Sequence, residues 1–269
     1  MKMKKIIALL LCMLMVFSFA SCAGSKDDNK TEATKAPNAT EAPAESEGGV
    51  IKMATNAYFQ PYEYYEGEKI VGIDAEIAEA IAKKLGMELV IEDMEFESIL
   101  TAVKSGSVDF GMAGMTVTED RLKEVDFSTS YANGVQVVIV KEGSDIKTVD
   151  DLSAEGATSK IGVQLGTTGD TYATGDFGAE RVTQYNNANN AVIALASGDI
   201  DCVIIDNEPA KALVAANEGL KILDTTYADE DYAICVKKGN TELLNKINAA
   251  IDELIEDGTI DTIVAKYIK

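Results

Sequence analysis

Residues 96–131 constrain the fold more than any other part of this chain. They read as a short helix, a glycine turn, a buried strand at 108–113, and a polar loop that opens a second helix. The mostly apolar strand suits burial on both faces, as in the sheets of α/β proteins. Ligands bind such sheets beyond the carboxyl ends of strands, where helices begin. Because Gly114, Thr116 and Arg121 follow the strand, we expect a carboxylate-binding site there.

The chain from residue 50 onward alternates between strand-like and helix-like patterns. In the helix predicted over 72–86, isoleucine or leucine recurs at every fourth position. Asp74 is expected to cap the start of this helix, and Gly86 suits its end. Predicted strands flank the helix at 51–55 and 87–92. Strand, helix and strand joined by short turns imply a parallel sheet with right-handed crossovers.

Two short motifs echo each other along the chain. SGSVDF at 105–110 and SGDIDC at 197–202 share Ser-Gly-x-Val/Ile-Asp followed by an apolar residue. Each follows an apolar, helix-like run and leads to a polar loop at a strand end. Chance is one explanation, since a helix, a glycine turn and a strand recur in many α/β proteins. We interpret the echo as a sign of two similar βα halves.

The N-terminal residues 1–22 have the features of an export segment. Lysines precede an apolar stretch at 6–17, which is short for a stable membrane span. Small residues then lead to Cys22, as in a lipobox, where the thiol receives a diacylglycerol; Phe19 stands where leucine is usual. The alternative is cleavage near Ser21 and a secreted protein. We expect the lipoprotein.

Residues 23–49 are predicted to be a disordered tether. They are rich in Ala, Thr, Glu, Lys, Ser and Pro and contain no periodic apolar positions, so they cannot bury enough surface to fold. As a coil, a segment of this length spans roughly 25–30 Å. Such a tether would let a module that starts near Val50 move above a membrane.

Composition and charge exclude several classes of function. The chain has 269 residues, no histidine and a formal net charge of −21, without a basic stripe, so nucleic acid is not an expected partner. Catalysis and metal binding by histidine are excluded. Cys202 and Cys235 each lie in an apolar, strand-like run, which predicts buried free thiols over a disulfide or a zinc site. No catalytic constellation or phosphate loop occurs, and we expect no cofactor and no metal.

Taken in order, six segments resemble the extracellular solute-binding proteins (family 3) of polar amino-acid ABC importers. They run through nearly all of the chain after residue 50: ATNAYFQPYEY at 54–64, GIDAEIAEAIAKKLG at 72–86, SGSVDFGMAGMTVTEDR at 105–121, VDFSTSY at 125–131, GVQLGTTGD at 162–170 and SGDIDCVIIDNEPA at 197–210.

The resemblance implies a two-lobed, type II periplasmic-binding-protein fold of the α/β class. Each lobe would be a mostly parallel sheet flanked by helices, with two hinge crossings between the lobes. Lobe 1 would comprise residues 50–136 and 230–269, and lobe 2 residues 137–229. The C-terminal helices would pack back on lobe 1, and Cys202 and Cys235 would lie in different lobes.

The resemblance also implies how an α-amino acid would be held. Its carboxylate would meet Arg121, Thr116, Thr167 and the amide of Thr168, and its ammonium would meet Asp206 and the carbonyl of Gly114. Its side chain would lie against Asn56, Phe59 and Phe96. Without the resemblance, Arg121 would be read as a surface residue paired with Glu119, Asp120 or Glu124, Asp206 as a helix cap, and the phenylalanines as core.

The expected function is binding of a polar L-amino acid outside the cell by lobe closure, and its delivery to the transmembrane subunits of an ABC permease. Some close relatives carry Asp where Asn56 stands, and Asn both donates and accepts, which favours glutamine over arginine or lysine. The expected location is the outer face of the cytoplasmic membrane, through the lipid on Cys22, or secreted or periplasmic without it. Two alternatives stay open: a cyclohexadienyl-dehydratase-like enzyme, for which Glu63 is a candidate acid, and an extracellular amino-acid sensor.

Overall fold

The computed structural model describes residues 48–268, which belong to one compact unit that runs from Ala44 to Lys269. The export segment, Cys22 and nearly all of the predicted tether lie outside the described residues. Within the described part of the chain, no helix is long and apolar enough to cross a membrane.

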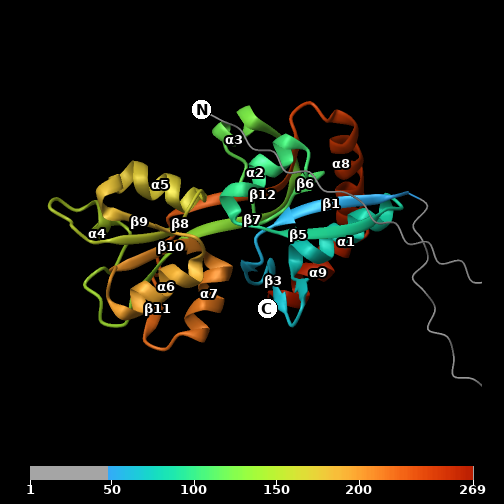
Figure 1. Ribbon diagram of the computed structural model, residues 1–269. Helices are drawn as coiled ribbons and strands as arrows, with labels where there is room; N and C mark the ends of the chain where they lie inside the picture. Colours follow the sequence, from blue (N-terminus) through green and yellow to red (C-terminus); the bar gives the residue numbers. More distant parts are fainter. Residues whose placement is uncertain (1–47, 269) are drawn as a thin grey trace, which may run out of the picture. The chain divides into compact units, whose positions relative to one another are not determined.

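The first half of the unit is built on three parallel strands (Figure 1). β1 (Val50–Thr55) pairs in parallel with both β5 (Glu88–Asp93) and β6 (Phe110–Gly111). Helices α1 (Ile73–Lys84) and α2 (Phe96–Ser105) connect these strands, as the sequence pattern predicts. β6 is much shorter than expected, because its chain leaves the ladder after Gly111 to form the polar loop.

The second half repeats this arrangement. β8 (Ile161–Gln164) pairs in parallel with both β9 (Val182–Tyr185) and β10 (Cys202–Asp206). Helices α5 (Thr168–Phe177) and α6 (Ala188–Ser197) connect them. Both begin beyond the carboxyl ends of strands, where ligands of α/β sheets bind.

Two long antiparallel strands join the halves into one sheet. β7 (Val125–Lys141) pairs with β12 (Ala228–Lys237) over most of its length and continues to pair with β10 and β11 (Leu220–Ile222). The resulting strand order is β5-β1-β6-β12-β7-β10-β8-β9, with β11 also on β7. β7 is a 17-residue strand that runs through both halves. Strands are parallel on either side of the crossings and antiparallel at them.

The clusters of buried apolar residues follow the predicted division into two lobes. The division itself stays a prediction. Two clusters of buried residues draw on positions before Ala132 and after Tyr232. The other two draw their buried members from positions between Val137 and Leu223. The C-terminal helices α8 (Thr241–Glu256) and α9 (Thr259–Tyr267) share the first of these clusters with α1.

The sequence echo is a repeated structural unit. α2 ends at Gly106 with φ 79°, and α6 ends at Gly198 with φ 90°, both in the left-handed region that favours glycine. The Asp of each motif then bonds to the first strand of its half through both backbone and side chain. Asp109 Oδ2 accepts from Lys52 N, and Asp201 Oδ2 accepts from Lys160 N, each at 2.7 Å.

The aromatic segment after β1 forms a second, antiparallel sheet. Its strands are β2 (Tyr58–Phe59), β3 (Glu63–Glu66) and β4 (Lys69–Val71). Each of these strands is too short to show the alternating pattern by which a strand is predicted from sequence. Gly72 follows them with φ 128°, and a Cβ there would lie 2.2 Å from the Tyr62 carbonyl oxygen, so only glycine fits.

The cap predicted for α1 is wrong. Gly72 is the N-cap residue, and no side chain caps the helix. Asp74 is fully buried inside the first turn and accepts from Gly114 N and Tyr131 Oη, each at 2.8 Å. Gly86 does follow the helix end with φ 69°. The remaining helical segments are α3 (Glu119–Glu124), α4 (Asp150–Ser153), the 3-10 turn η1 (Ala179–Arg181) and α7 (Asn207–Ala216).

Both cysteines of the folded part are buried and free, as predicted. Cys202 and Cys235 belong to different core clusters. Burial raises the pKa of each thiol to about 12, so both behave as small apolar side chains.

Candidate functional site

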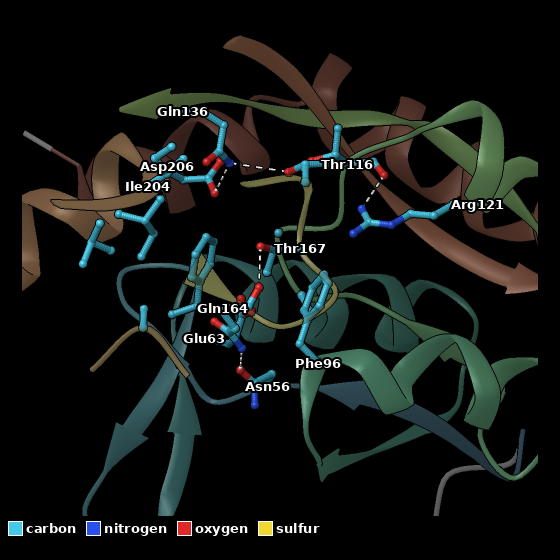
Figure 2. A pocket seen from close by; sticks show the side chains of 17 residues that line it. Asn56, Glu63, Phe96, Thr116, Arg121, Gln136, Gln164, Thr167, Ile204 and Asp206 are labelled. Atoms are coloured by element: carbon cyan, nitrogen blue, oxygen red, sulfur yellow. Dashed lines mark hydrogen bonds between the residues drawn. The ribbon is translucent and has the colours of Figure 1, made fainter. Parts of the chain in front are cut away.

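A pocket of about 500 Å³ brings together every residue predicted to touch the ligand (Figure 2). It lies where the polar loop after β6, the loop after β8 and the end of β10 meet, at the carboxyl ends of strands. The predicted residues that line it are Asn56, Phe59, Phe96, Gly114, Thr116, Arg121, Thr167, Thr168 and Asp206. Polar residues that also line it, and that were not predicted as ligand contacts, are Glu63, Gln136 and Gln164.

Arg121 is a buried cation on the wall of this pocket. Arg121 is only 9% exposed, so it is not a surface residue that forms an ion pair. Nη1 donates to the Thr116 carbonyl at 2.8 Å and Nη2 to the Gly166 carbonyl at 3.1 Å. The guanidinium lies over the Phe96 ring, 5.3 Å from its centre. Among residues 48–268, Arg121 forms no ion pair, while Asp120 and Glu124 pair with lysines.

Burial lowers the pKa of Arg121, which shows that the pocket wall is costly for its charge. A guanidinium nonetheless stays protonated, because its ordinary pKa is so high. A buried cation without a counter-ion is unfavourable, and a carboxylate entering the pocket would relieve it. The backbone of Arg121 is fixed by Thr118, whose hydroxyl caps α3 by accepting from Arg121 N at 3.2 Å.

Asp206 is the last residue of β10 and precedes α7. Although it occupies the N-cap position, its side chain makes no capping hydrogen bond, so the helix-cap reading is wrong. Its Oδ2 accepts from Gln136 Nε2 at 2.7 Å, and its Oδ1 accepts from the Tyr232 hydroxyl. Burial raises the pKa of Asp206 well above its usual range, and the nearby Glu230 raises it further.

The N-terminus of α5 faces the pocket through two threonines. Thr167 caps the helix: its Oγ1 accepts from Asp170 N at 3.2 Å and donates to the Gln164 carbonyl at 2.8 Å. Thr168 is the first helical residue, so its N–H has no partner within the helix. The backbone of Thr168 is therefore placed to bind an anion, whereas the Thr167 hydroxyl is engaged in capping.

Asn56 is held by two hydrogen bonds at the other end of the pocket. Its Oδ1 accepts from Gln164 Nε2 at 2.9 Å, and its Nδ2 donates to the Met94 carbonyl at 2.8 Å. The Gln164–Asn56 bond joins the end of β8 to the loop after β1. Because both functional atoms of Asn56 are engaged, its amide is a poor basis for choosing a ligand.

Glu63 is the residue that sequence reasoning missed as a ligand contact. It belongs to β3, is fully buried, and lines the pocket. Burial raises its pKa well above the usual range, and the nearby Asp74 carboxyl raises it further. Burial also raises the pKa of Asp74 to about 6. Glu63 therefore carries the proton of this pair at neutral pH.

Phe59 and Gly114 fix the shape of the wall. Gly114 has φ 52°, and a Cβ there would lie 2.7 Å from Phe59 Cε1, so the aromatic ring lies directly on the glycine. Asp74 holds the N–H of Gly114, as described above. Phe59 also stacks on Tyr62 with ring centres 5.8 Å apart. The phenylalanine is thus both a packing residue and part of the pocket.

Comparison with known proteins agrees with this geometry. Residues 51–269 match the bacterial extracellular solute-binding proteins, family 3. The chain belongs to this family. It is 31% identical to the arginine-binding extracellular protein ArtP of Bacillus subtilis, across 98% of both chains. It is 32% identical to the ABC transporter glutamine-binding protein GlnH of the same organism, across 99% of this chain and 98% of that one.

Solved structures show the same fold. An ancestral arginine-binding protein bound to glutamine is 41% identical, with a TM-score of 0.76 over 81% of this chain and 97% of its own. The ancestral protein bound to arginine is 40% identical, with a TM-score of 0.76 over 84% of this chain and 100% of its own. The fold is therefore the type II periplasmic-binding-protein fold.

This family member is the extracellular amino-acid-binding component of an ABC transporter. The relatives are binding proteins, so the dehydratase reading is not supported and the chain is not an enzyme. In the described residues, no group of histidine, cysteine, aspartate or glutamate side chains is arranged to hold a metal ion.

Proposed function

We propose that this protein binds a polar L-α-amino acid in the pocket at Arg121 and Asp206, closes its two lobes around it, and delivers it to an ABC permease. The observation that carries the proposal is the placement of a buried guanidinium and a buried carboxyl group on opposite walls of the pocket. Arg121 supplies an uncompensated cation, and Asp206 a buried carboxyl group. An α-amino acid presents the matching carboxylate and ammonium a short distance apart.

Ligand-driven closure follows from where these residues come from. Arg121, Thr116 and Gly114 belong to the predicted lobe 1, and Thr168 and Asp206 to lobe 2. Neither lobe alone meets both ends of an amino acid, so the ligand stabilises the arrangement in which the lobes meet. The bonds from Gln164 to Asn56 and from Arg121 to Gly166 support this, since each crosses between the proposed lobes.

For the side chain of the ligand, we favour arginine, with glutamine second. The preference for glutamine rested on Asn56, whose polar atoms bind Gln164 and Met94 instead. The pocket and its nearest buried neighbours hold the acids Glu63, Asp74, Asp206 and Glu230 against the single guanidinium of Arg121. This excess of acid suits a ligand with a net positive charge, and Glu63 would ionise beside a guanidinium.

Isothermal titration calorimetry of purified protein with L-arginine, L-glutamine, L-lysine and L-histidine tests the proposal. A ligand present at 100 times its dissociation constant should raise the free energy of unfolding by about 2.7 kcal/mol. Chromatography after long incubation should recover the ligand unchanged. Absence of binding by every amino acid would refute the proposed function, and tighter binding of glutamine would reverse our ranking.

Closure is tested by small-angle X-ray scattering with and without ligand. We expect a smaller radius of gyration with ligand, and Asp206→Asn should weaken both binding and compaction. The matched control is Asp199→Asn, which removes the same charge from an exposed position on the same half. Tight binding without compaction would support the binding function but refute the proposed closure of the lobes.

We also propose that Cys22 carries a lipid that anchors the protein to the outer face of the cytoplasmic membrane. The support is in the sequence: an apolar export segment, small residues before Cys22 and a polar tether after it. Anchoring would keep the binding protein near its permease, within the reach of the tether.

A further inference from the structure

Two buried acids share one amide donor beside the pocket. Gln136 Nε2 donates to Asp206 Oδ2 at 2.7 Å and to Glu230 Oε2 at 2.9 Å. The three residues are 1%, 8% and 5% exposed, in the order Gln136, Asp206, Glu230. Glu230 Oε1 is buried with no hydrogen-bond partner in the described chain. No lysine or arginine of residues 48–268 forms an ion pair with either acid.

This cluster is built into adjacent strands of the sheet. Asp206 lies opposite Gln136 on the paired strands β10 and β7, and Glu230 comes from β12, which pairs with β7 on its other side. The three side chains are therefore held together by the sheet itself, whether or not the lobes meet across the pocket. Glu230 is thus beside Asp206 before any ligand arrives.

Other groups around the cluster do not neutralise it. Those that face or electrostatically influence the two acids are Gln136 on β7, Tyr232 on β12, Thr168 and Tyr172 on α5, Tyr62 and Glu63 beside the small sheet, and Arg121 on α3. Arg121 is the only cation among these, and its two hydrogen bonds go to the Thr116 and Gly166 carbonyls and not to either acid. Asp206 is therefore a buried carboxyl group with a second acid close beside it, an environment that disfavours the ionised form of Asp206.

We propose that Glu230 is a positioning residue that keeps Asp206 protonated in the free protein, so that binding of the ligand ammonium releases a proton from Asp206 to solvent. The inference rests on the proposed function. In the step, the O–H bond of Asp206 breaks, the proton leaves to water, and the carboxylate forms an ion pair with the R–NH₃⁺ group. Burial and the adjacent Glu230 both raise the pKa of Asp206, in agreement with this.

The test is calorimetry of the full chain in buffers of different ionisation enthalpy, across about pH 5 to 8. The slope of the observed enthalpy against the buffer enthalpy gives the protons released per ligand. L-Glutamine is the main probe, because its neutral side chain does not require Glu63 to ionise. We expect release of at least about 0.5 proton near the acid end of this range, falling as pH rises through the pKa of Asp206.

Glu230→Gln should lower the proton release, and should move the pH at which affinity levels off downward by about one unit or more. Asp229→Asn is the matched control: it removes a charge from the neighbouring, exposed position of the same strand and should leave the release unchanged. Glu230→Asp keeps the charge and should retain release, which separates the effect from loss of folding.

The outcomes separate the two proposals. No binding of L-arginine or L-glutamine at any pH would overturn the proposed function. Binding of either without proton release in wild type would overturn this inference alone. Equal proton release from wild type and Glu230→Gln would show that Glu230 has no part in the release.

Discussion

Replacing Arg121 by lysine tests how much of the affinity comes from the guanidinium fork. Two carbonyl oxygens already take one N–H each from Nη1 and Nη2 of Arg121. A guanidinium has five N–H donors, so three remain for a ligand carboxylate. A lysine ammonium has three in all and cannot serve both carbonyls and a bidentate carboxylate. Arg121→Lys should therefore weaken ligand binding by about 2–5 kcal/mol, the range for breaking a desolvated charge pair.

Arg181 provides a matched control within the same chain. Its Nε donates to the Ser159 carbonyl at 3.0 Å and its Nη1 to the Leu152 carbonyl at 2.8 Å. Its guanidinium lies 5.8 Å from the centre of the Phe177 ring. Two carbonyls and one aromatic ring are also the contacts of Arg121, but Arg181 does not line the pocket. Either substitution should lower the free energy of unfolding of the ligand-free protein by about 1–2 kcal/mol.

The assay combines calorimetry with urea denaturation of both variants. The expected pattern is a large loss of affinity in Arg121→Lys alone and a similar, small loss of stability in both. Affinity within twofold of wild type in Arg121→Lys would show that the fork does not bind the carboxylate. An equal loss of affinity in Arg181→Lys would show that the effect is general destabilisation.

Two further predictions follow from the structure, and a third follows from the sequence. First, burial raises the pKa of Asp74 to about 6 from an ordinary value of 3.8, because the buried site favours the protonated carboxyl group. The stability that the protonated Asp74 gives the folded protein is therefore complete below pH 3.8 and is lost as the pH rises through 6. At 1.36 kcal/mol per unit, this amounts to at most about 3 kcal/mol, and urea denaturation of ligand-free protein should show more stability near pH 5 than near pH 7.5; a steady loss on acidification contradicts this. Second, Gly114→Ala should weaken ligand binding at least about tenfold in calorimetry, because φ at this position is 52° and an added Cβ would clash with Phe59. Unchanged affinity would show that the pocket wall adjusts to the added methyl group. Third, Cys22→Ser should move the protein from the detergent phase to the aqueous phase; wild type found unmodified in the medium would exclude the anchor.

The alternation of strands and helices was predictable because it depends on local pattern, whereas the two-lobed fold and the individual pocket residues were predicted from the resemblance to the family. Apolar runs and helical periodicity located the strands and helices on both sides of the crossings. The echo at Gly106 and Gly198 located the two strands after which polar residues converge. Since strand ends on one edge of a sheet come together, the nine predicted ligand residues meet in one pocket.

What the sequence could not show is how side chains from distant elements share hydrogen bonds. Asp74 looked like a helix cap because it stands near the start of α1, yet it binds Gly114, 40 positions away. Gln136 was not singled out, and Glu63 was named only as the candidate acid of the dehydratase alternative, because the environment of both depends on the packing of other strands. The hydrogen bonds of Asn56 to Gln164 and Met94 were invisible for the same reason, and they removed its value as a guide to the ligand.

The buried acids connect stability with binding. In the free protein, Glu63, Asp74 and Asp206 lie where ionisation is unfavourable, and Arg121 carries a charge without a counter-ion in the described chain. Each arrangement lowers the stability of the empty closed form at neutral pH. A ligand that supplies an ammonium and a carboxylate satisfies both walls at once, so groups that destabilise the closed form without ligand stabilise it with ligand. Under the proposed closure, these groups would therefore favour the open form when the site is empty and the closed form when it is filled, a difference that a permease could recognise.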